Sequence, residues 1–131
     1  MVIAYEAHKN QVDKSGVPYI YHPIHVAEQM NTENECIIAL LHDVVEDTNV
    51  SFKQLEEVFS KEIIDILKLL TREENIEYDE YIKRIKNNSI ACKVKIADLT
   101  HNLDKTRLDF VTEVDVKRNE KYKKALQILY Y

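Results

Sequence analysis

The chain has 131 residues, the length of one domain, and can bury a hydrophobic core without a disulfide or a structural metal. Hydrophobic residues make up 45% and charged residues 31%, a globular composition, and one glycine with two prolines leaves few turn-formers for a many-stranded sheet. The net charge of −5 disfavours a general nucleic-acid coat or an anionic-membrane binder, because both need a basic surface.

Composition therefore predicts an all-α fold, and since no repeat or linker-like tract divides the chain, we expect a single domain over residues 1–131. Cys36 and Cys92 each have an apolar residue on one side, which favours buried thiols of a reducing compartment over a disulfide. The N-terminal segment lacks the cationic lead and apolar stretch of a signal peptide. The longest apolar run, 36–41, is far too short to span a membrane, so we expect a cytoplasmic protein.

The first half of the chain carries the signals of four helices, in the order 2–9, 23–30, 32–43 and 51–59. Residues 15–18, Ser-Gly-Val-Pro, are the clearest turn signal, because they hold the only glycine. Pro23 suits the first turn of the second helix, where its missing N–H costs nothing. Thr32 and Ser51 are each followed three residues later by Glu or Gln, the capping-box pattern that opens a helix.

The second half is predicted to contain helices over 60–70, 78–86, from Ser89 onward, and over 114–130. The polar and acidic segment 72–77 is predicted to be a surface loop. Apolar residues recur at helical spacing, so each helix has an inward face. The residues predicted to face inward are Ile63, Ile64, Leu67, Leu70, Ile90, Val94, Ala97, Tyr122, Ala125, Leu126 and Leu129.

Four residues of metal-ligating type stand in apolar surroundings: His22, His42, Asp43 and Asp98. His42 and Asp43 follow the wholly apolar run 37–41, where two polar side chains are costly without a partner. A divalent cation is one such partner, and imidazole with carboxylate ligation suits Mn²⁺, Fe²⁺ or Zn²⁺. A capped or salt-bridged polar residue is the competing interpretation for each residue taken singly, and spacing alone does not join Asp98 to the other three.

Glu46 and Asp47 follow directly after His42 and Asp43. Two adjacent carboxylates beside a metal site are able to position and deprotonate a water, or to protonate a leaving group. They are equally compatible with a solvated approach to the helix that Ser51 caps.

The pattern of His22, His42-Asp43 and Asp98 resembles the HD-domain metal-dependent phosphohydrolases. The residues around these positions narrow the resemblance to the hydrolase domain of the RelA/SpoT family. In its short length the chain resembles the stand-alone small alarmone hydrolases of that family. The stretches that carry the resemblance, in order, are AHKNQ at 7–11, KSGVPYIYHP at 14–23, ALLHDVVEDT at 39–48, and KIAD at 95–98 with His101-Asn102.

The resemblance implies an all-α HD fold that hydrolyses the 3′-pyrophosphate of (p)ppGpp to GDP or GTP and pyrophosphate. It implies Mn²⁺ as the usual ion, and a small nucleotide as the partner, with neither nucleic acid nor membrane. The residues that it assigns are His22, His42, Asp43 and Asp98 as metal ligands, Glu46 and Asp47 as the pair that organises the attacking water, and Lys14, Asn102 and Tyr122 as substrate contacts.

Two positions depart from the family pattern, and both remove positive charge. Asp13 stands where the family usually has an arginine that holds the guanine base, and Leu99 stands where the family often has Arg or Lys. Two alternative functions stay open for this reason. One is an HD phosphohydrolase acting on another nucleotide, and the other is a metal-bound nucleotide-sensing domain with little turnover.

Overall fold

The computed structural model describes residues 1–12, 18–105 and 113–130 of the chain. Within these residues the secondary structure is helical, apart from an isolated antiparallel bridge between Val12 and Pro18. The helices are α1 (Val2–His8), α2 (Tyr21–Glu28), α3 (Glu33–Leu41), α4 (Val44–Asp47), α5 (Phe52–Glu56), α6 (Lys61–Leu70), α7 (Tyr78–Lys86), α8 (Ser89–Lys105) and α9 (Glu113–Tyr130). The prediction of an all-α fold is confirmed.

Side-chain caps fix several helix starts where the sequence predicted them. The Ser51 hydroxyl accepts from the backbone N–H of Gln54 while the Gln54 side chain accepts from the Ser51 N–H, which completes a capping box. Thr32 makes only half of the predicted box. Its hydroxyl accepts from the Glu35 N–H, but the Glu35 carboxylate turns instead to the Asn31 N–H and the Lys93 ammonium.

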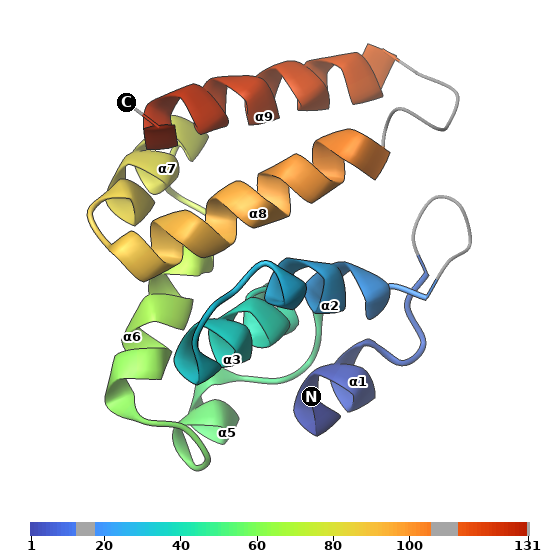
Figure 1. Cartoon of the computed structure of the whole chain (residues 1–131), viewed down its shortest axis with the longest axis vertical. Helices are drawn as coiled ribbons and strands as arrows, with labels where there is room; N and C mark the ends of the chain where they lie inside the picture. The colour runs from blue at the N-terminus through green and yellow to red at the C-terminus, as the bar shows by residue number, and fades with distance from the viewer. Residues whose placement is uncertain (13–17, 106–112, 131) are drawn as a thin grey trace.

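Figure 1 shows α8 and α9 lying side by side along one edge of the molecule, with α2 and α3 below α8. α2 packs against both α3 and α8, and α3 also contacts α6 and α8. The core side chains that are fully excluded from solvent include Val26 of α2, Ile38 of α3, Ile82 of α7 and Val94 of α8. The crossing of α2, α3 and α8 is thus held rigidly by apolar packing.

α8 buries a broader face than the predicted one, because Ile90, Val94 and Ala97 pack in or against the core and Ala91 and Leu99 join them. Ala91, Val94 and Leu99 are wholly buried, whereas Ile90 and Ala97 are only half-buried. α8 is flanked by α2, α3, α6, α7 and α9, so a stripe broader than the apolar pattern alone is covered. None of the helices among the described residues combines the length and apolar character that crossing a lipid bilayer requires.

Candidate active site

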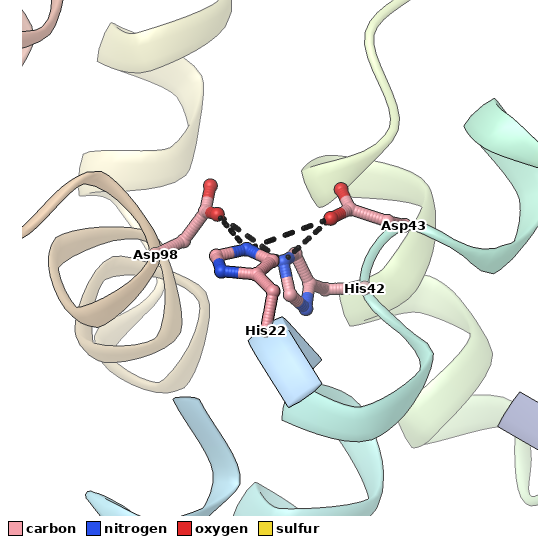
Figure 2. A group of neighbouring side chains, drawn as sticks. All are labelled: His22, His42, Asp43 and Asp98. Atoms are coloured by element: carbon pink, nitrogen blue, oxygen red, sulfur yellow. Dashed lines mark hydrogen bonds and ion pairs between the residues drawn. The ribbon is translucent and has the colours of Figure 1, made fainter. Parts of the chain in front are cut away.

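The structure brings together His22, His42, Asp43 and Asp98, which come from three separate stretches of the chain. His22 lies in the first turn of α2, His42 ends α3, Asp43 precedes α4, and Asp98 lies within α8. One ligand-type atom from each of the four lies within 4.8 Å of all the others. In Figure 2 the two imidazole rings lie between the two carboxylates.

The distances within the cluster are short. Asp98 Oδ1 lies 2.7 Å from His22 Nε2 and 3.3 Å from His42 Nε2, while Asp43 Oδ2 lies 3.0 Å from His42 Nε2 and 3.8 Å from His22 Nε2. His22, His42 and Asp98 are each no more than 4% exposed. Two nitrogens and two carboxylate oxygens that converge in this way fit a divalent cation such as Mn²⁺, Fe²⁺ or Zn²⁺.

A hydrogen bond to the backbone of Ala39 fixes the orientation of the His42 ring. Its Nδ1 lies 2.5 Å from the Ala39 carbonyl oxygen, which only accepts, so Nδ1 carries a proton and donates it. In the neutral ring Nε2 then presents its lone pair to the cluster, as a metal ligand must. Burial opposes protonation of His42, yet the Asp43 and Asp98 carboxylates raise its pKa well above the usual value.

Asp98 is surrounded by donors that compensate for its burial. Lys95 donates to Oδ2 over 3.0 Å, and the Asn102 amide donates to Oδ1 over 3.2 Å. Burial alone would raise the pKa of Asp98, but the Lys95 ammonium and the His42 imidazole lower it well below its usual value. The carboxylate is therefore ionised, as metal ligation requires, and the Lys95 ammonium also lies 5.4 Å from the centre of the Tyr81 ring.

Asp43 is held by Tyr19, a residue to which the sequence analysis assigned no role. The Tyr19 hydroxyl donates to Asp43 Oδ2 over 2.5 Å. The Tyr19 ring packs between His8 and His22, with ring centres 4.9 Å and 5.7 Å away. Burial and the Asp43 carboxylate raise the pKa of Tyr19, so the hydroxyl keeps its proton and remains a donor.

His101 also belongs to the surroundings of the site. Its ring stacks on His22 at 4.9 Å and on His25 at 4.1 Å, and the Nδ1 atoms of His22 and His101 lie 2.6 Å apart. The position of His101 next to Asn102 did not predict these ring contacts, because helical spacing does not show which helix lies opposite. The signal in the sequence was the presence of His101 in the last matching stretch.

The Glu46 and Asp47 side chains are accessible to solvent on α4, one turn beyond the cluster. Gln11 donates to the Asp47 carbonyl oxygen over 2.7 Å, and Arg72 donates its backbone N–H to Glu46 Oε2 over 3.4 Å. Partial burial and the carboxylates of Asp43 and Glu46 raise the pKa of Asp47 to about 6. A pocket of about 460 Å³ adjoins the pair and is lined in part by Glu6, Lys9, Asn10 and Gln11.

Of the predicted substrate contacts, the structure describes Asn102 and Tyr122. Asn102 donates to Asp98, as helical spacing predicted. Tyr122 is half-buried, and burial followed by the Asp98 carboxylate raises its pKa. Lys14 and Asp13 lie outside the described residues. Leu99 is wholly buried in the core, so packing accounts for its apolar side chain. That this position lacks a charge found in the family stays a prediction.

Comparison with known proteins identifies relatives of this chain. Residues 1–92 match the HD domain family. The chain is 37% identical over 117 residues to guanosine-3′,5′-bis(diphosphate) 3′-pyrophosphohydrolase of Haemophilus influenzae, covering 78% of this chain and 17% of the relative. It is 36% identical over 113 residues to guanosine-3′,5′-bis(diphosphate) 3′-pyrophosphohydrolase MESH1 of Danio rerio, covering 76% of this chain and 63% of that protein. This chain thus spans less than two thirds of either.

A solved structure has the same fold. It was described as a metazoan ortholog of SpoT that hydrolyzes ppGpp and plays a role in starvation responses. The TM-score is 0.78 at 26% sequence identity, and the match covers 96% of this chain and 80% of the other.

Proposed function

This chain belongs to the HD domain family, and we propose that it is a metal-dependent hydrolase that removes the 3′-pyrophosphate of guanosine 3′,5′-bis(diphosphate). The observation that carries the proposal is the convergence of two imidazoles and two carboxylates within 4.8 Å. The named activity of the relatives from Haemophilus and zebrafish, and of the metazoan SpoT ortholog, supplies the substrate class.

We assign His22, His42, Asp43 and Asp98 as the ligands of one divalent cation. Mn²⁺ is our proposal for the ion, and Fe²⁺ and Zn²⁺ suit the same donors. When bound, such an ion polarises a phosphoryl oxygen and lowers the pKa of its water toward neutrality. Metal analysis of the purified protein distinguishes the three ions.

Glu46 and Asp47 have the proton-handling role in this proposal. Hydrolysis adds a water oxygen to the phosphorus next to the ribose 3′ oxygen, breaks the bond between them, and needs one proton taken from the water and one given to the 3′ oxygen. A carboxyl with a pKa of about 6, as Asp47 has, both accepts and releases a proton near neutral pH. Glu46 is held by the Arg72 backbone and orients the water.

Asn102, Tyr122 and Lys14 are the proposed substrate contacts. Asn102 is supported by its hydrogen bond to Asp98, whereas Tyr122 and Lys14 follow the resemblance. We also propose a single domain over residues 1–131, a small nucleotide as partner and a cytoplasmic location. The cytoplasmic location is supported by two cysteines, Cys36 and Cys92, that are both free thiols.

The decisive test is product analysis after incubation of the Mn²⁺-loaded protein with ppGpp. We expect pyrophosphate and GDP as products. Glu46→Gln should keep its metal and lower kcat by about 100-fold or more, because general acid–base groups contribute roughly that much. Glu57→Gln is the matched control, since Glu57 is exposed and remote from the cluster in sequence, and it should hydrolyse at the wild-type rate.

Other products decide between the alternatives. If inorganic phosphate is released instead, or if only a different nucleotide is hydrolysed, the chain is still an HD phosphohydrolase, but one with another substrate. Tight ppGpp binding without any product would favour a sensing domain. If the Glu46→Gln variant hydrolyses ppGpp at the wild-type rate, the proton-handling role of Glu46 is refuted.

A further inference from the structure

Tyr78, at the start of α7, is flanked by two cations. The Lys121 ammonium lies 3.9 Å from the centre of the Tyr78 ring, and the Arg72 guanidinium carbon lies 5.5 Å from it. The Tyr78 hydroxyl is buried and has no hydrogen-bond partner among the residues that the structure describes. A buried hydroxyl without a partner costs free energy unless something else satisfies it.

The two cations lack carboxylate partners. In the described part of the chain, neither Arg72 nor Lys121 lies within ion-pair distance of an Asp or Glu side chain, whereas their neighbours Lys68, Arg84 and Lys124 do. Among the described residues, the acceptor of Arg72 Nε is a backbone carbonyl oxygen, that of Ile76, over 3.2 Å. Burial, together with the charges of Arg72, Lys95 and Arg118, lowers the pKa of Lys121, as expected where positive charge accumulates.

This group adjoins the candidate active site on two sides. The Arg72 backbone N–H contacts the Glu46 carboxylate at 3.4 Å. The Tyr78 ring lies 5.8 Å from the Tyr81 ring, over which the Lys95 ammonium sits, and Lys95 in turn binds Asp98. Burial also raises the pKa of Tyr78 to about 12, so its hydroxyl remains protonated and able to donate.

We propose that Arg72, Tyr78 and Lys121 form an anion-binding subsite that takes a phosphate group of the substrate other than the one under attack. This proposal rests on the proposed function. Two unpaired cations and an unpartnered donor suit a phosphate, because its oxygens accept from all three. The subsite also supplies positive charge next to a cluster that is itself rich in carboxylates, in a chain of net charge −5.

Binding to the Mn²⁺-loaded protein tests the subsite directly, with inorganic pyrophosphate and GDP as separate probes. Arg72→Gln and Lys121→Gln should each weaken binding by about tenfold, the expected loss of one charge-assisted hydrogen bond. If the variants bind both probes more weakly, the subsite takes phosphate groups in general. If they bind only GDP more weakly, the subsite takes the 5′-diphosphate of a nucleoside. Lys123→Gln, with the same charge change on the same helix, should bind both probes as the wild type does.

Tyr78→Phe separates a binding role from a structural one. It keeps the ring under both cations and removes only the unpartnered hydroxyl, so we expect weaker probe binding with a melting temperature that is unchanged or higher. Unchanged binding of both probes by Arg72→Gln and Lys121→Gln would overturn the subsite. If binding depends on Lys121 but ppGpp is not hydrolysed, the subsite stands and the proposed reaction falls.

Discussion

At the scale of single residues, Lys95 determines how Asp98 can act. The Lys95 ammonium occupies Asp98 Oδ2, which leaves Oδ1 directed at His22 and His42. The Lys95 side chain is only 14% exposed, so this is a buried ion pair whose separation leaves an uncompensated charge. Lys95 is therefore a positioning residue, since it acts on the site through the orientation and charge of Asp98.

Lys95→Met should destabilise the metal-free protein by about 3–5 kcal/mol, because the buried Asp98 carboxylate loses its main cationic partner. The loss should be smaller with Mn²⁺ present, since a bound cation also neutralises that carboxylate. Urea unfolding with and without Mn²⁺ measures the difference. Lys124→Met is the control. Lys124 pairs with Asp79 over 2.9 Å, and both side chains are exposed, so the substitution should cost no more than about 1 kcal/mol in either state. An equal loss for Lys95→Met with and without metal would contradict the link to the metal centre.

The residues of the site were predictable to different degrees. His22, His42, Asp43 and Asp98 were found because each polar side chain stands in an apolar setting within a recognisable pattern. The contact between His22 and His101 joins residues far apart in the chain and depends on which faces of α2 and α8 meet. Periodicity assigns a residue to a face of its own helix but does not identify the facing side chain.

At the scale of elements, the Ser51 cap separates α5 from α4, the short helix that carries Glu46 and Asp47. α4 and α5 are too short to be stable by themselves, and α5 begins at the Ser51 capping box a few residues beyond Asp47. The sequence predicted this start correctly, because the cap is a local signal. It predicted α5 as longer than it is, since Val58 and Phe59 continue the helical spacing, although Val58 is 62% exposed.

Ser51→Ala should lower the free energy of unfolding by about 1 kcal/mol, since the Gln54 N–H loses the hydroxyl that accepts from it, while the Ser51 N–H keeps its bond to the Gln54 side chain. Thermal or urea unfolding measures this. Ser89→Ala is a suitable control, because at the start of α8 the cap is supplied by Asn88, whose side chain accepts from the N–H groups of Ile90 and Ala91. Ser89→Ala should change stability by less than about 0.5 kcal/mol. Equal effects of the two substitutions would mean that the Ser51 cap does not stabilise the fold.

At the scale of the whole molecule, the candidate metal centre joins three helices that meet only after folding. α2, α3 and α8 contact one another pairwise, and each contributes a ligand, directly or at its end. Composition and periodicity predicted the helices but not this crossing, because packing between distant segments is not a local property. The unfolded chain has no preformed site, so the free energy of metal binding adds to the free energy of folding.

Divalent metal should therefore raise the melting temperature. At a free Mn²⁺ concentration 100 times the Kd, the stabilisation is about 2.7 kcal/mol, which corresponds to a shift of roughly 10 °C for a chain of this size. Differential scanning calorimetry of the chelator-treated protein, titrated with Mn²⁺, measures the shift. Asp43→Asn should abolish most of it by removing one ligand, whereas Asp65→Asn, on the exposed face of α6, should retain it. A full shift in Asp43→Asn would mean that the ion binds elsewhere, and no shift in the wild type would refute the metal centre.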